Sequence, residues 1–289
     1  MATLLIGARG QLGTELRQAF ADDDLVALAH ADLELTDRAK VWEALDTYRP
    51  GLILNTAAYH RVDECEDEPE RAFGVNALAV RNLAMAAKRI GAVMVHFSTD
   101  YVFDGRQSRP YQEGDPPGPL SVYATSKLAG EFFVRAVLDK YFLIRTCGLY
   151  GTAGSLAKGG NFVETMLRLA REGREIRVVG DQVLTPTSAR DLAKKVRQLI
   201  ETERYGLYHI TNSGECSWYR FASAIFELAG LRARLSETTS AAYGARATRP
   251  AYSVLDNANL RSLGIDDLRD WRDALADYLD EQKRSGGQF

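Results

Sequence analysis

Short apolar runs alternate with helical patterns through the first half of the chain. The runs are rich in Leu, Ile and Val, and the stretches between them repeat apolar residues with the period of a helix. We predict strands at 3–6, 25–28, 52–54, 92–97 and 141–144, and the longest helices between them at 69–90 and 121–138. Strands that alternate with helices indicate βαβ units, in which helices cover both faces of a parallel sheet.

The second half is less regular. A glycine-rich loop is expected at 151–160 and a frayed end at 285–289. Helices are predicted at 161–172, 188–201, 217–228 and 268–279, with strands at 176–179 and 208–210. The fold class that follows is α/β, with a Rossmann-type doubly wound parallel sheet and a smaller C-terminal α/β substrate domain.

Composition and charge exclude several classes of protein. The chain has 289 residues, of which 46% are hydrophobic and 26% charged, and its net charge is −3. That balance is typical of a soluble globular protein and argues against nucleic-acid or membrane partners. No apolar run reaches the ~18 residues of a membrane span, and no basic start indicates a signal peptide, so we expect a cytoplasmic protein. Three widely spaced cysteines indicate neither a disulfide framework nor a zinc site.

Glycines follow the first predicted strand with a spacing that suits phosphate binding. Gly7, Gly10 and Gly13 open the first predicted helix. Such a turn brings backbone N–H groups and a helix N-terminus to a pyrophosphate, so it predicts a dinucleotide site. No acidic residue ends the second strand to take a ribose hydroxyl, and Arg9 can meet a 2′-phosphate, which slightly favours NADPH over NADH. The alternative is a glycine turn that only packs a helix on a strand.

A second pattern carries acid–base chemistry. Tyr123 and Lys127 lie four residues apart on a predicted helix and therefore share one face. A nearby ammonium stabilises a phenolate, so we expect a lowered Tyr123 pKa and a role in giving a proton to a carbonyl oxygen. Thr99, or alternatively Ser98, ends the fourth strand, where it can orient the same oxygen. The alternatives are a surface helix pair and strand-end capping.

These motifs together resemble the extended short-chain dehydrogenase/reductases, and within them the dTDP-4-dehydrorhamnose reductases. The matching pieces include GARGQLG at 7–13, NTAAYHRVDECE at 55–66, HFSTDYVFDG at 96–105 and KLAGE at 127–131. The resemblance covers nearly the whole chain. It implies NAD(P)H-dependent reduction of the C4 ketone of dTDP-4-dehydro-L-rhamnose to dTDP-L-rhamnose. It also implies an NAD(P)-binding domain at 1–150, with parts of about 180–205 returning to it, and a sugar-nucleotide domain at 151–289.

The resemblance also implies roles for individual residues. Tyr123 would be the proton donor, Lys127 its partner and ribose anchor, and Thr99 the third catalytic residue. The implied cofactor contacts are Gly7, Gly10, Gln11, Leu12, Gly13, Glu34, Leu35, Ala57, Ala58 and Tyr59, together with Tyr123 and Lys127. The implied substrate contacts are Thr99, Asp100, Val102, Phe103, Asn161 and Arg249.

Three departures from the family pattern change the expectations. Gly148 stands where the family often has Trp, which removes an apolar wall at the sugar, and Tyr252 stands where Asn is usual. A metal-bridged dimer of some members uses three glutamates, of which Glu15 matches one while Arg190 and Arg272 replace the others. Guanidinium groups do not bind Mg²⁺, so we expect no metal and a monomer or weak dimer.

Two other functions fit the same motifs. The regulatory β subunit of methionine adenosyltransferase resembles these reductases and acts by binding a partner chain. A related reductase or epimerase of another nucleotide sugar is the second alternative. The intact set of Tyr123, Lys127 and Thr99 favours an enzyme, because a binding subunit does not require all three.

Overall fold

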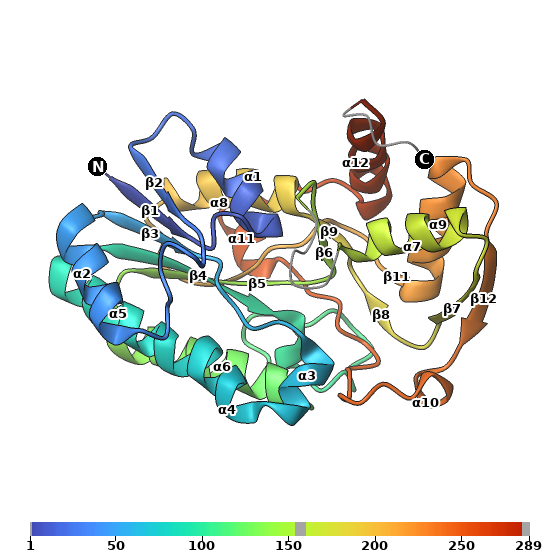
Figure 1. Cartoon of the computed structure of the whole chain (residues 1–289), viewed down its shortest axis with the longest axis horizontal. Helices are drawn as coiled ribbons and strands as arrows, with labels where there is room; N and C mark the ends of the chain where they lie inside the picture. Colours follow the sequence, from blue (N-terminus) through green and yellow to red (C-terminus); the bar gives the residue numbers. More distant parts are fainter. Residues whose placement is uncertain (1, 154–159, 285–289) are drawn as a thin grey trace.

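A six-stranded parallel sheet forms the centre of the larger part of the molecule (Figure 1). The computed structural model describes residues 2–153 and 160–284. The strand order is β10-β5-β4-β3-β1-β2. The strands are β1 (Thr3–Ile6), β2 (Leu25–Leu28), β3 (Leu52–Asn55), β4 (Val93–Thr99), β5 (Tyr141–Thr146) and β10 (Gly206–His209). All five neighbouring pairs are parallel, so the predicted doubly wound sheet is confirmed.

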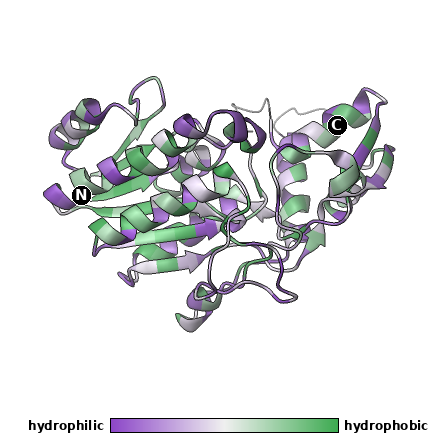
Figure 2. Ribbon diagram, turned by 90° about the horizontal axis from the view of Figure 1, so that it is seen from below, coloured by the Kyte–Doolittle hydropathy of each residue, from purple (hydrophilic) through white to green (hydrophobic). Residues whose placement is uncertain are grey.

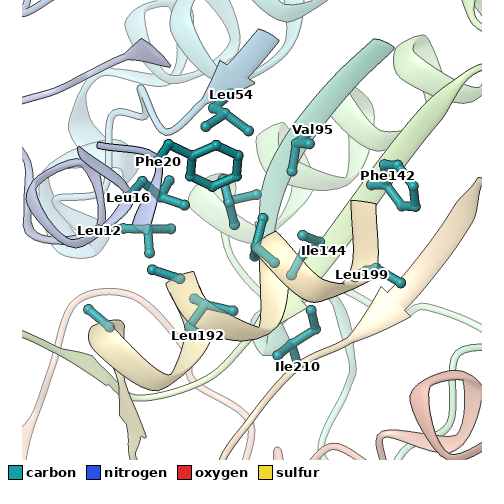
Figure 3. Close-up of a cluster of buried hydrophobic side chains, with 14 of the residues drawn as sticks. Leu12, Leu16, Phe20, Leu54, Val95, Phe142, Ile144, Leu192, Leu199 and Ile210 are labelled. Carbon is teal, nitrogen blue, oxygen red and sulfur yellow. The ribbon is translucent and has the colours of Figure 1, made fainter. Parts of the chain in front are cut away.

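Helices cover both faces of this sheet. Helices α1 (Gln11–Ala19) and α8 (Ala189–Ile200) pack on one face, and α2 (Arg38–Tyr48), α5 (Ala79–Ile90) and α6 (Val122–Val137) pack on the other. The first core joins Leu12, Leu16 and Phe20 of α1 to Leu192 and Leu199 of α8 over the strands (Figure 3). The apolar strands lie between helices whose outer sides are polar (Figure 2). Helix α8 thus packs on the large sheet and β10 is one of its edge strands, although both follow residue 151 in the sequence.

A smaller α/β unit lies beside the sheet. Its core packs α7 (Phe162–Arg171), α9 (Trp218–Ala229) and α12 (Trp271–Arg284) against β7 (Glu175–Val179). Strand β12 (Arg234–Thr238) pairs with β7, and short strands β6 (Leu149–Tyr150), β8 (Val183–Leu184), β9 (Thr187–Ser188) and β11 (Cys216–Ser217) form two more pairs. Strand β12 escaped prediction because it is polar and largely exposed and so carries no hydrophobic pattern.

The predicted helix at 69–90 is interrupted. It consists of α4 (Pro69–Phe73), a π-helical turn (Gly74–Leu78) and α5. Shorter helices α3 (Val62–Asp67), α10 (Ser240–Tyr243) and α11 (Ala258–Ser262) and a 3₁₀ turn (Asp100–Val102) complete the fold. In the two described ranges, no helix combines the length and apolar character needed to cross a membrane. The expected frayed end lies outside the described residues.

Candidate active site

The glycine turn after β1 packs closely against the start of α1. Gly7 has φ +84°, and its carbonyl oxygen accepts the Gly10 N–H at 2.9 Å. A Cβ at Gly13 would lie 2.2 Å from that oxygen, so only glycine fits there. The N–H groups that open α1 have no intrahelical partners. A close-packed glycine turn at a helix N-terminus leaves backbone N–H groups accessible to a pyrophosphate, and as a cofactor site it remains a prediction.

The other predicted cofactor residues differ in burial and in their hydrogen-bond partners. The Gln11 amide donates to the Leu149 carbonyl at 2.8 Å, and Leu12 packs in the first core. The Glu34 carboxylate accepts from Thr36 at 2.8 and 3.0 Å, whereas Leu35 is buried in the second core. Ala57 and Ala58 are half-buried after β3. As contacts to a cofactor, these positions remain predictions.

The π-helical turn holds the segment that contains Tyr59. The Asn76 amide accepts the Tyr59 N–H and donates to the Tyr59 carbonyl, both at 2.9 Å. It also donates to Ser126 of α6 at 3.0 Å. A Cβ at Gly130 would lie 2.3 Å from the Asn76 carbonyl oxygen, so α6 passes unusually close to the turn. The irregular turn therefore fixes the loop after β3 against the helix that carries Tyr123.

Lys127 is anchored at the carboxyl end of β4. Ser121 caps α6, which places Tyr123 and Lys127 in its first two turns. The Lys127 ammonium, buried in the protein, donates to the Phe97 carbonyl at 2.6 Å. Burial lowers the Lys127 pKa to about 8, and Glu131 one turn further along opposes that shift. Lys127 thus holds a fixed position with donors to spare.

The predicted lowering of the Tyr123 pKa is wrong. Burial raises that pKa above its ordinary value, the charge of Asp100 raises it further, and a hydrogen bond with Thr99 opposes both. Lys127 does not compensate, since its ammonium is directed to the Phe97 carbonyl. Tyr123 therefore keeps its proton at neutral pH, which is the form that a proton donor needs.

Four buried polar side chains, here called the Asp100 cluster, lie beside Tyr123: Thr99, Asp100, Cys147 and Ser253. Thr99 and Cys147 each donate to the Asp100 carboxylate at 3.0 Å, and Ser253 hydrogen-bonds it as well. Burial raises the Asp100 pKa, while these three hydrogen bonds oppose the shift. The sequence pattern identified Thr99 and Asp100 but gave Cys147 only a packing role, because its partner lies 47 residues away.

The remaining predicted substrate residues have protein partners in the structure. Val102 and Phe103 are fully buried in a core cluster. Asn161 caps α7, and its amide donates to Gly151 and Tyr278 at 2.9 and 3.1 Å. Arg249 pairs with Asp63 of α3 at 2.7 Å and hydrogen-bonds Tyr101, which faces Tyr123 edge-on. As substrate contacts, these residues remain predictions.

Gly148 does not leave an open space. It has φ +54°, and a Cβ there would lie 2.7 Å from the Leu184 side chain and 3.1 Å from Pro186 Cα. The Leu184–Pro186 segment therefore packs directly against Gly148, and the missing apolar wall at the sugar remains a prediction. Tyr252, the other departure, donates to Glu215 at 2.7 Å.

The three positions that form a metal bridge in some family members make ion pairs in this chain. Glu15 is buried, accepts from Thr152 at 2.6 Å and lies 3.8 Å from Arg190, which also pairs with Glu281. Arg272 pairs with Glu227 at 2.7 Å. Within the described ranges, no three His, Cys, Asp or Glu side chains gather as metal ligands. The lack of Mg²⁺ and the monomer or weak dimer remain predictions.

Comparison with known proteins agrees with this geometry. The family model described as the RmlD substrate binding domain matches residues 1–284. A spore coat polysaccharide biosynthesis protein, SpsK of Bacillus subtilis, is 42% identical over 281 residues, which cover 96% of this chain and 97% of the relative. The dTDP-4-dehydrorhamnose reductase of Streptomyces griseus is 42% identical over 286 residues, covering 95% and 91%.

A crystal structure extends the comparison to three dimensions. That of dTDP-4-dehydrorhamnose reductase from Bacillus anthracis in complex with NADP superposes with a TM-score of 0.93 at 38% identity, covering 97% of this chain and 99% of the other. The shared length, sheet and motif positions lead to one conclusion: the chain belongs to the RmlD family of NAD(P)H-dependent reductases.

Proposed function

We propose that this chain reduces the C4 ketone of dTDP-4-dehydro-L-rhamnose with NADPH and so forms dTDP-L-rhamnose. The observation that carries the proposal is the protonated Tyr123 beside Thr99, with Lys127 anchored one helical turn away. Relatives named for this reaction, and one that binds NADP, support it. We assign the cofactor to the six-stranded sheet and the sugar nucleotide to the smaller C-terminal unit.

Each residue has a definite task in this reaction. The backbone of Gly7, Gly10 and Gly13 would hold the pyrophosphate of NADPH, which supplies the hydride when it is bound. Tyr123 gives its proton to the ketone oxygen, so that no alkoxide accumulates. Thr99 hydrogen-bonds the Tyr123 hydroxyl, and Lys127, held by the Phe97 carbonyl, would use its remaining donors to anchor the nicotinamide ribose.

A second candidate is the same reduction on a different nucleotide sugar. The observation that favours it is Gly148, which stands where the family often has Trp and against which the Leu184–Pro186 segment packs. SpsK, which is named only for spore coat polysaccharide biosynthesis, is as similar to this chain as a named rhamnose reductase. The catalytic residues would act identically, and only the walls of the sugar site would differ.

A substrate panel separates these possibilities. The purified chain is mixed with NADPH and with dTDP-4-dehydro-L-rhamnose, its dTDP-linked 4-keto epimers or UDP-linked 4-ketoses, and the loss of NADPH absorbance is followed. The proposal expects the fastest turnover with dTDP-4-dehydro-L-rhamnose. Faster turnover of another ketose would support the second candidate. Turnover of none, together with capture of a methionine adenosyltransferase, would refute reduction and indicate a binding subunit.

A further inference from the structure

The Thr99 hydroxyl has more acceptors around it than its single proton can serve. A threonine hydroxyl donates once and accepts twice. Here Oγ1 accepts the Tyr101 N–H at 3.2 Å, donates to Asp100 Oδ1 at 3.0 Å and shares a third hydrogen bond with Tyr123. The hydrogen bond with Thr99 lowers the Tyr123 pKa, as a bond donated to a phenolate does, so the single Thr99 proton has two competing acceptors, the Asp100 carboxylate and the Tyr123 oxygen.

Proton transfer to a substrate would upset this arrangement. Once Tyr123 has given its proton to a ketone oxygen, the phenolate can only accept hydrogen bonds. It then faces the lone pairs of Thr99 and the negative charge of Asp100, in a buried site where an unsatisfied charge is costly. The arrangement is restored only if the Thr99 hydroxyl rotates and donates to the phenolate. That rotation removes one donor from Asp100.

Two donors from remote segments remain on Asp100. Cys147, at the end of β5, donates its thiol proton to Oδ2 at 3.0 Å, and Ser253 hydrogen-bonds the same carboxylate. Ser253 is held there by its own N–H, which donates to the Val183 carbonyl at 2.8 Å. We propose that Cys147 and Ser253 are positioning residues that keep the Asp100 carboxylate hydrogen-bonded while Thr99 turns its single proton to the Tyr123 phenolate. This inference rests on the proposed function.

The proton count of the step is balanced. The Tyr123 proton moves to the oxygen of the product alcohol. Thr99 keeps its proton covalently bound and changes only the acceptor, and the Cys147 and Ser253 protons stay in place. Neither residue touches the reacting atoms, so removing one should slow the chemical step without weakening substrate binding.

The test compares Cys147→Ala, Cys147→Ser and Ser253→Ala in steady-state reduction. We expect kcat to fall about tenfold in each alanine variant, the effect of losing one hydrogen bond to a charged group, with KM little changed. Cys147→Ser keeps a donor and should retain most of the kcat. Cys216→Ala is the matched control, because Cys216 is another buried thiol but packs in the C-terminal core.

A double-mutant cycle distinguishes this role from a purely structural one. If Cys147 acts through Thr99, then Cys147→Ala should not reduce kcat further in a Thr99→Val background, while its effect on thermal stability should persist. Additive losses of kcat, or a Cys147→Ala variant with wild-type kcat, would overturn the inference. Should Cys147→Ala not fold, Ser253→Ala decides by the same criteria. A wild-type chain that reduces no ketose would overturn the proposed function, and this inference with it.

Discussion

Tyr123 and Lys127 are positioned by a single helix, whereas the Asp100 cluster is assembled from segments that are far apart in the sequence. Tyr123 and Lys127 lie on one helix, so the helix itself sets their spacing. The Asp100 cluster joins three segments, with Cys147 47 residues from Asp100 and 106 residues from Ser253. In the proposed function the helical pair supplies the reaction, and the assembled cluster sets the charge around Tyr123. The comparison teaches that local geometry supplies the chemistry here, whereas tertiary packing tunes the proton donor.

The largest effect should come from the helical pair. Tyr123→Phe removes the proton donor, and we expect kcat to fall by roughly 10²–10⁴-fold while NADPH still binds. Tyr243→Phe serves as control, because Tyr243 is an exposed tyrosine on α10. Steady-state kinetics and NADPH titration measure the two quantities. Near-normal turnover of Tyr123→Phe would end the assignment of Tyr123 as the acid.

The second prediction concerns a buried ion pair that joins α6, which carries Tyr123 and Lys127, to β5, which precedes Cys147. Glu131 of α6 accepts two hydrogen bonds from Arg145 of β5, at 2.6 and 2.9 Å, and both side chains are buried. Glu131→Gln leaves the guanidinium without its counter-charge, so we expect a loss of about 3–5 kcal/mol in the free energy of unfolding.

An exposed pair provides the reference for this measurement. Glu172→Gln breaks the Arg168–Glu172 pair, which joins exposed side chains at 3.1 Å, and should cost no more than about 0.5 kcal/mol. Urea denaturation gives both values. Equal losses in the two variants would show that the buried pair does not hold α6 on β5.

A smaller effect tests the packing next to Cys147. Gly148 and Gly91 both have positive φ, but only Gly148 has neighbours where a Cβ would be placed. Alanine at either position should cost about 1–2 kcal/mol of backbone strain. Gly148→Ala should lose more than Gly91→Ala because of the Leu184–Pro186 segment. If thermal denaturation gives the same loss for both, the Leu184–Pro186 segment moves aside without a cost in stability.

The smallest expected effect is a pH dependence of the activity, caused by the titration of Lys127. Burial lowers the Lys127 pKa from its ordinary 10.5 to about 8. Above pH 8 Lys127 is mostly neutral in the folded chain. If its charge is needed for the reaction, kcat/KM of the free enzyme should fall about tenfold per pH unit.

The stability linked to Lys127 should change in the opposite direction. Between pH 8 and 10.5 the unfolded chain still binds the Lys127 proton and the folded chain does not, so the stability that Lys127 contributes rises with pH. Measured against Lys127→Met, the wild type should gain stability across that window while its activity falls. A flat activity profile to pH 10 would mean that the charge of Lys127 is not needed.

The sequence alone indicated the half of the chain that forms the large sheet and the residues proposed to react. Apolar runs marked the buried strands, because a strand covered on both faces has no polar side. Glycine spacing marked the turn after β1, and a four-residue spacing marked Tyr123 and Lys127, because these features depend only on neighbouring residues. Strand β12 was missed, since a polar edge strand is defined by its pairing and not by its own pattern.

Only the tertiary structure decided the electrostatics of the site. The sequence indicated a lowered Tyr123 pKa, because the ammonium is near it on the helix; the fold buries the phenol beside Asp100 and directs that ammonium to the Phe97 carbonyl. The packing of the Leu184–Pro186 segment against Gly148 was likewise absent from the sequence pattern. Burial and long-range hydrogen bonds set these properties, and both depend on residues that are neighbours only after folding.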